Sequence, residues 1–190
     1  MTPFNQDVHY QIIKNLYKGR KAKRTDVPYI THIDEGLVVL DTLSAPLISK
    51  QGYCLHPVVQ LDEELHRMLA YHPNLLAECN PASIIIAMEY RQQLNRFSSQ
   101  TVINPRRQLL IKNLNDVMSK TPYLRPMAIA DKVQNRKDFL TYHKGKHPRS
   151  QELDYYFKTW LYDILEVDEE KYLRLASAID CNKVLGEKDN

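Results

Sequence analysis

The chain has 190 residues, which is enough for one full hydrophobic core and short for two, so a single domain is expected. Its hydrophobic fraction of 43% and charged fraction of 26% are typical of a soluble globular protein. A net charge of +3 is too small to indicate nucleic-acid binding by itself, because a binding surface needs clustered charge.

Cysteine usage and hydropathy indicate the compartment. The three cysteines, Cys54, Cys79 and Cys181, contain no CxxC spacing, so the sequence predicts neither a disulfide framework nor a thiolate zinc site. The first 24 residues contain no apolar stretch of signal-peptide length, and no run approaches the roughly 20 apolar residues that span a bilayer. We therefore expect a soluble, cytoplasmic protein with reduced thiols and no membrane partner.

The long segments have helical rather than alternating periodicity, and the chain has only five glycines, so an all-α protein is predicted. In chain order, helices are expected at about residues 5–18, 28–43, 45–60, 61–72, 80–97, 104–118, 125–143, 150–165 and 168–179. Residues 1–181 are expected to form one helical domain, and residues 182–190 a frayed C-terminal tail.

The segment 80–97 carries a clear start signal, with Asn80 as a plausible N-cap and Pro81 at the first helical position. Its first half is almost entirely apolar before Glu89 and Arg91. This pattern predicts that the segment is the central helix and that Glu89 is buried.

Polar side chains inside apolar helices are informative, because burying them costs free energy unless they are paired. The residues that stand out in this way are His32, His56, Glu89, Arg91, Asp131 and Asn135. Two histidines and one carboxylate from three separate helices are a plausible divalent-metal site. The alternative is that both histidines are hydrogen-bonded core residues and that Asp131 pairs with Lys132 or Arg136.

Three stretches, "RTDVPYITHIDEGLVV", "GYCLH" and "AIADKVQNRKDF", resemble motifs of the HD-domain phosphohydrolase superfamily. Within that superfamily the resemblance is to the hydrolase domain of RelA/SpoT-like alarmone enzymes, and it covers about residues 5–165. It implies an all-α bundle that uses one divalent ion, typically manganese, to cleave pyrophosphate from a nucleotide.

The resemblance also implies roles for individual residues. The implied metal ligands are His32, His56 and Asp131. The implied substrate-binding residues are Lys23 and Arg24, from the region that contacts guanine and phosphate in the family, and Asn135, which matches an asparagine of the family's third motif. The basic cluster at residues 18–24 would then face substrate phosphates, while a role in binding nucleic acid is the weaker alternative.

The chain departs from the family at its most specific motif. Where the family has His-Asp this chain has His56-Pro57, and where the family has Glu-Asp three residues later it has Gln60-Leu61. Gln60 can donate or accept a hydrogen bond at a catalytic site, but it cannot act as a general base.

Three interpretations of this loss remain. Asp62 or Glu63 could replace the missing acid if Pro57 ends one helix and another restarts with a different direction. Glu89 could supply a carboxylate from the segment 80–97. Alternatively, the metal is lost and the fold survives as a binding or regulatory protein.

The sequence thus predicts a divergent, metal-dependent nucleotide phosphohydrolase or pyrophosphohydrolase. Its catalytic candidates are Gln60, Asp62 and Glu89. The alternative is a catalytically inactive HD-fold protein that binds a nucleotide or a protein partner.

Overall fold

The computed structural model describes residues 3–23, 25–71, 74–97 and 107–186. Within these ranges all regular elements are helical, and the only β-type pairing is an isolated bridge between Lys21 and Pro28. The α-helices are α1 (Val8–Tyr17), α2 (Ile30–Thr42), α3 (Leu47–Gln60), α4 (Asp62–Tyr71), α5 (Pro81–Arg96), α6 (Arg107–Lys120), α7 (Leu124–Asp138), α8 (Ser150–Lys158) and α9 (Glu169–Gly186). The all-α prediction is confirmed. None of the described helices is long and apolar enough to cross a membrane.

Short helical segments extend or precede several α-helices. Two 3-10 segments lie at Pro3–Gln6 and Leu75–Glu78, and two π-helical segments follow α7 and α8 at Phe139–His143 and Thr159–Ile164. The predicted helices 125–143 and 150–165 are therefore each an α-helix that continues into a wider helical turn.

The ends of the helices follow local chemistry. The Asn80 side chain accepts a hydrogen bond from the Ala82 backbone N–H at 3.0 Å, and Pro81 occupies the first helical position, as predicted. At the C-terminal end, α9 extends to Gly186, within the segment 182–190 for which a frayed tail was predicted. No glycine or proline precedes Gly186 in this stretch, so nothing in the sequence stops the helix earlier.

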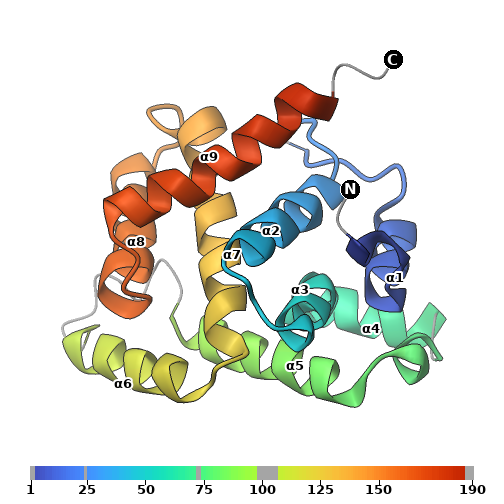
Figure 1. Ribbon diagram of the computed structural model, residues 1–190. Helices are drawn as coiled ribbons and strands as arrows, with labels where there is room; N and C mark the ends of the chain where they lie inside the picture. The colour runs from blue at the N-terminus through green and yellow to red at the C-terminus, as the bar shows by residue number, and fades with distance from the viewer. Residues whose placement is uncertain (1–2, 24, 72–73, 98–106, 187–190) are drawn as a thin grey trace.

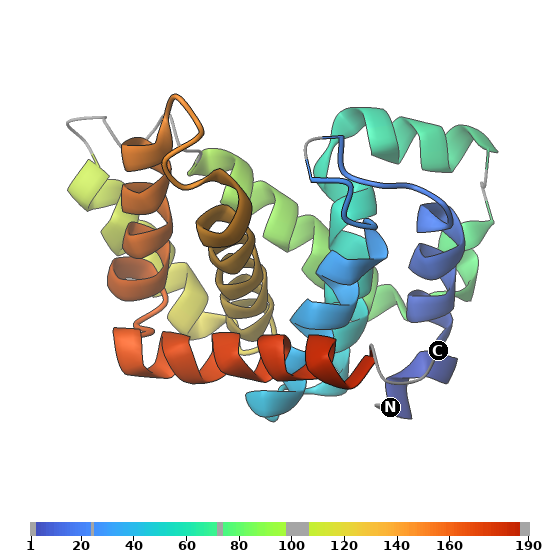
Figure 2. The ribbon, with the colours of Figure 1, turned by 90° about the horizontal axis from the view of Figure 1, so that it is seen from above.

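The central helix is α7, which runs between α2 and α3 on one side and α8 on the other (Figures 1 and 2). It packs against α2, α3, α5 and α9, and every residue from Met127 to Gln134 is buried. The prediction that α5 is central was wrong, since Ile85 is 66% exposed and Met88 is 40% exposed. The polar residues of α7 suggest an exposed helix, but they are buried because they pair with one another inside the protein.

Pro57 lies inside α3, which continues beyond it to Gln60. The helix ends at Leu61, which has extended backbone angles, and α4 begins at Asp62. The structure therefore does not support the interpretation in which Pro57 ends one helix and another restarts. The chain changes direction four residues later, so the acids of α4 do not follow His56 on the same helix.

One main hydrophobic cluster extends from Phe4 to Ile179 and joins buried residues of α1 to α7 and α9, while Tyr156 of α8 packs against it. Its largest fully buried side chains include Tyr53 of α3, Tyr90 of α5 and Trp160 of the π-helical segment after α8. A single continuous core that draws on both ends of the chain is the expected property of one domain.

Candidate metal site

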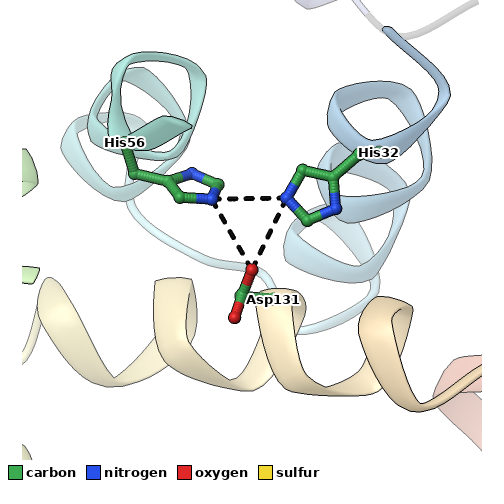
Figure 3. Close-up of side chains that lie close together, drawn as sticks. All are labelled: His32, His56 and Asp131. Atoms are coloured by element: carbon green, nitrogen blue, oxygen red, sulfur yellow. Dashed lines mark hydrogen bonds and ion pairs between the residues drawn. The ribbon is translucent and has the colours of Figure 1, made fainter. Parts of the chain in front are cut away.

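Three of the predicted site residues come together where α7 crosses α2 and α3 (Figure 3). The Nε2 atoms of His32 and His56 lie 3.5 Å and 3.6 Å from Oδ1 of Asp131. The two Nε2 atoms lie 3.3 Å from each other. Among the described residues, these three form a group whose ligand atoms all lie within 4.8 Å of one another.

The helices explain why this group forms. His32 lies in the first turn of α2, His56 near the end of α3, and Asp131 in the middle of α7. His56 and Asp131 are almost fully buried, whereas the His32 side chain is 24% exposed. The site is therefore closed on the α3 and α7 sides and reaches solvent beside His32.

Gln134 fixes the hydrogen of the His32 ring. Its amide nitrogen donates to Oδ2 of Asp138 at 2.7 Å and to Oε2 of Glu35 at 3.2 Å. Its amide oxygen must then face His32 Nδ1, which lies 2.6 Å away. Since an amide oxygen only accepts, Nδ1 carries the hydrogen and Nε2 of His32 presents a lone pair to the site.

A buried ion pair supports this amide. Nζ of Lys137 lies 2.5 Å from Oε1 of Glu35, and both side chains are almost fully buried. Glu35 therefore receives charge-assisted bonds from both Lys137 and Gln134, which hold the glutamine in place. The neighbouring carboxylate, Asp34, accepts a hydrogen bond from the Tyr10 hydroxyl at 2.8 Å.

The ring of His56 is fixed by its own helix. Its Nδ1 lies 2.5 Å from the backbone carbonyl oxygen of Tyr53. A carbonyl oxygen can only accept, so Nδ1 of His56 is the donor, and in the neutral ring its Nε2 presents a lone pair. Aromatic rings of Tyr53 and Tyr90 pack on either side of the imidazole, with centroids 4.6 Å and 5.0 Å away.

Asp131 completes a group of three electron-rich atoms. Burial alone would raise the pKa of Asp131, but the Lys132 ammonium, 2.8 Å from Oδ2, holds this pKa well below its usual value. Oδ1, the atom that faces the histidines, accepts a hydrogen bond from Asn135 at 2.8 Å. The expected pairing of Asp131 with Lys132 is present together with the metal-site geometry.

These contacts leave two nitrogen lone pairs and a carboxylate oxygen facing one another without a hydrogen between them. Protonation of His32 would relieve the repulsion, but burial lowers the pKa of His32 more than the charge of Asp131 raises it. A divalent cation satisfies all three atoms, because neutral imidazole nitrogen and carboxylate oxygen are ordinary metal ligands.

Two tyrosines lie beside the three ligands. The Tyr53 hydroxyl donates to the backbone oxygen of His32 at 3.1 Å and lies 3.4 Å from its Nε2. The Tyr90 hydroxyl is fully buried and has no hydrogen-bond partner among the described residues. Burial, and then the negative charge of Asp131, raise the pKa of Tyr90 well above its usual value, so this hydroxyl keeps its hydrogen.

The expected replacement acids lie elsewhere. Asp62 is exposed and pairs with Arg91, and Glu63 is exposed and pairs with Arg67 at 3.2 Å. Glu89 accepts a hydrogen bond from Gln93 at 2.7 Å. None of these carboxylates belongs to the described group of potential ligands.

The geometry of α4 and α5 explains these positions. The turn at Leu61 directs α4 away from His56, and Glu89 lies on α5 beside the exposed residues Ile85 and Met88. The next residue, Tyr90, is the one that faces the site. Gln60, the third catalytic candidate, is the last residue of α3 and is partly exposed.

A cavity of about 450 Å³ is connected to the ligand group through Asn135, which lines the cavity and donates a hydrogen bond to Asp131. Its walls include Lys23 and Asn135, two of the predicted substrate-binding residues, and Asn135 also contacts Asp131. Aromatic and apolar residues, Tyr29, Phe139, Leu153 and Phe157, form one part of the remaining wall, and the polar residues Thr25, Asp138 and His143 form another. The third predicted residue, Arg24, lies outside the described residues.

Sequence reasoning missed Gln134, Tyr53 and Tyr90. A signal for Gln134 was present, because Asp131, Gln134, Asn135 and Asp138 follow helical spacing and form one polar face of their helix. No local signal marks the two tyrosines, since aromatic residues in helices are usually simple core contacts.

Comparison of the chain with known protein families, curated proteins and solved structures gives no significant match. The resemblance to HD-domain phosphohydrolases therefore stays a prediction from short motifs. The functional argument below rests on the residues and their geometry.

Proposed function

We propose that the protein is a divergent, metal-dependent phosphohydrolase or pyrophosphohydrolase that acts on a nucleotide. The observation that carries this proposal is the convergence of His32, His56 and Asp131 with both imidazole hydrogens directed away from the site. The adjoining cavity supplies a place for the substrate.

The spacing of the ligand atoms supports a metal site. Ligand atoms about 2.1 Å from a tetrahedral ion lie about 3.4 Å apart, whereas adjacent ligands of an octahedral ion lie about 3.0 Å apart. The distances of 3.3, 3.5 and 3.6 Å are nearer to the tetrahedral value. Catalytic zinc sites commonly have three protein ligands and an open fourth position. Zinc is therefore a candidate beside the manganese that the resemblance implies.

When bound, such an ion supplies Lewis acidity and lowers the pKa of water at neutral pH. The protein residues hold and orient the components. Lys132 and Asn135 fix the two oxygens of Asp131, and Gln134 fixes His32. Tyr90 places a buried hydroxyl beside the negatively charged Asp131.

The cavity is suited to a nucleotide. Its volume lies within the range of roughly 300–1,000 Å³ typical of small-molecule sites. The aromatic and apolar wall offers a surface for a base, and the exposed ammonium of Lys23 offers a positive charge for a phosphate. Asn135 connects the two, because it lines the cavity and contacts Asp131.

A second candidate function is nucleotide binding without hydrolysis. It is favoured because neither predicted replacement acid belongs to the ligand group. Asp62 pairs with Arg91, and Glu89 accepts a hydrogen bond from Gln93. A site with one carboxylate that is already bound to a metal has no free carboxylate to accept a proton from water.

Metal analysis and a hydrolysis assay test both candidates. Purified protein is loaded with Zn²⁺ or Mn²⁺, and bound metal and turnover of a panel of nucleoside polyphosphates are measured. His56→Ala and Asp131→Asn are expected to abolish both metal binding and hydrolysis. His66→Ala, on an exposed part of α4, is the matched control and should change neither.

The outcomes separate the proposals. Wild-type protein that binds metal and nucleotide but hydrolyses none of the panel supports the second candidate. If wild-type protein binds neither Zn²⁺ nor Mn²⁺, the phosphohydrolase proposal is contradicted. Asp62→Asn adds a direct check on the predicted replacement acid, and it should leave bound metal unchanged because Asp62 is exposed.

A further inference from the structure

The position of Pro57 within α3 creates an unusual acceptor. In an α-helix, the N–H of residue 57 would donate to the carbonyl oxygen of Tyr53, four residues earlier. Proline has no N–H, so this carbonyl loses its helical donor although α3 continues to Gln60. The oxygen lies in a buried part of the helix, where an unpaired carbonyl is costly.

The His56 side chain takes the place of the missing donor. Its Nδ1 lies 2.5 Å from the Tyr53 oxygen, which is a short hydrogen bond between a ring and a carbonyl three residues apart. The imidazole is 1% exposed and is held between the rings of Tyr53 and Tyr90. The absence of an N–H at Pro57 therefore leaves the Tyr53 carbonyl oxygen free to accept the hydrogen bond from its neighbour His56.

We infer that Pro57 is a positioning residue for His56. By withholding an N–H, it leaves the Tyr53 carbonyl to the Nδ1 hydrogen of His56, and this fixes the ring so that the Nε2 lone pair faces His32 and Asp131. The consequence for metal binding rests on the proposed function, whereas the consequence for the hydrogen position does not.

A residue with an N–H at position 57 restores the competing donor. The backbone N–H of residue 57 then donates to the Tyr53 carbonyl oxygen. The Nδ1–H of His56 is no longer the only donor to this oxygen. The neutral ring can place its hydrogen on Nε2, where it meets Oδ1 of Asp131 at 3.6 Å as a donor. A ring with this hydrogen cannot bind a metal through Nε2.

The test compares Pro57→Ala with wild type, and uses Pro126→Ala as the matched control. Pro126 lies in the first turn of α7, where a missing N–H removes no hydrogen bond within that helix. Long-range ¹⁵N–¹H NMR of the metal-free proteins reports which ring nitrogen of His56 carries the hydrogen. Zn²⁺ affinity is measured separately by competition with a chelator.

Wild-type protein and Pro126→Ala are expected to hold the His56 hydrogen on Nδ1. Pro57→Ala is expected to shift a substantial fraction of it to Nε2 and to weaken Zn²⁺ binding about 10- to 100-fold, the usual effect of losing a partner that orients a ligand. Its thermal midpoint should not fall, because proline inside a helix is unfavourable. A purely structural role for Pro57 would leave the NMR signature unchanged.

Several results would overturn the inference. Wild-type His56 with its hydrogen on Nε2 contradicts it without any variant. Pro57→Ala with an unchanged hydrogen position, or with a shifted hydrogen and unchanged Zn²⁺ affinity, also contradicts it. If the hydrogen shifts as expected but wild-type protein binds no Zn²⁺, the link between Pro57 and His56 stands and the proposed function fails.

Discussion

Gln134 is the residue on which the orientation of His32 depends, so its replacement is a sharp test of the site. Gln134→Leu keeps a similar volume but removes the acceptor of the His32 hydrogen and two donors to carboxylates. Lys137 still neutralises Glu35, and Asp138 is partly exposed, so neither carboxylate becomes an isolated buried charge.

The expected cost follows from these partners. Hydrogen bonds to charged groups contribute about 1.5–3 kcal/mol each, and with Glu35 and Asp138 partly compensated we expect a net loss of about 2–3 kcal/mol in the free energy of unfolding. The His32 ring also becomes free to change its hydrogen position, so the affinity for Zn²⁺ should fall about 10- to 100-fold. Urea denaturation of the metal-free protein and chelator competition measure the two effects.

A matched control separates stability from metal binding. Gln93 is also a buried glutamine, on α5, and it donates to Glu89 rather than to a ligand-orienting residue. Gln93→Leu should lower stability without changing the Zn²⁺ affinity. A folded Gln134→Leu protein that binds Zn²⁺ as tightly as wild type would refute the argument that Gln134 orients His32.

Three further predictions concern the same region. Asp131→Asn leaves the buried Lys132 without its carboxylate, so urea denaturation should show a loss of about 3–5 kcal/mol in the free energy of unfolding. Adding Lys132→Met should recover much of this stability but should not restore Zn²⁺ binding. A double variant that stays as unstable as Asp131→Asn would contradict the buried ion pair. Gly36→Ala should destabilise the protein by about 1–3 kcal/mol because the new Cβ lies 2.0 Å from the Tyr53 hydroxyl oxygen, and the loss should shrink in a Tyr53→Leu background. Burial lowers the pKa of His32, so the unfolded chain binds its proton first; the stability of metal-free protein should fall as pH drops below about 6.5, and less so in His32→Gln.

The sequence was a good guide wherever the signal was local. Helical periodicity and the Asn80–Pro81 start signal predicted the elements, and the motif residues His32, His56 and Asp131 lie together in the structure. Each of these features depends on residue types within one segment, or on motifs that share a known arrangement.

The sequence was a poor guide wherever burial depended on pairing between helices. Composition favoured α5 as the central helix because it contains consecutive isoleucines. The helix α7 is the more buried one, but it carries charged residues that pair with one another inside the protein, so its composition does not indicate burial. The same limitation placed Glu89 at the site instead of Tyr90, one residue later. The rotation of a helix about its axis is set by its packing partners, and these are distant in sequence.

The charges around Asp131 predict a further property of the site. Asp131 is the only carboxylate among the three ligand residues, and Lys132 already lies 2.8 Å from its second oxygen. With both histidines neutral, these four side chains carry no net charge. A divalent ion therefore introduces two positive charges into a largely buried place, while Lys23 and Asp138 bring opposite charges to the neighbouring cavity and balance each other.

An anion that reaches this site should consequently strengthen metal binding, and the metal should strengthen anion binding by the same factor. We expect Zn²⁺-loaded protein to bind a nucleoside monophosphate about 5- to 150-fold more tightly than metal-free protein, a range typical of coupled sites. Calorimetric titration measures both affinities. The matching nucleoside, which has no phosphate, is the control and should bind equally to both forms. Equal affinity of the monophosphate for the two forms would contradict the charge argument, because an uncompensated divalent ion this close to the cavity must favour a phosphate.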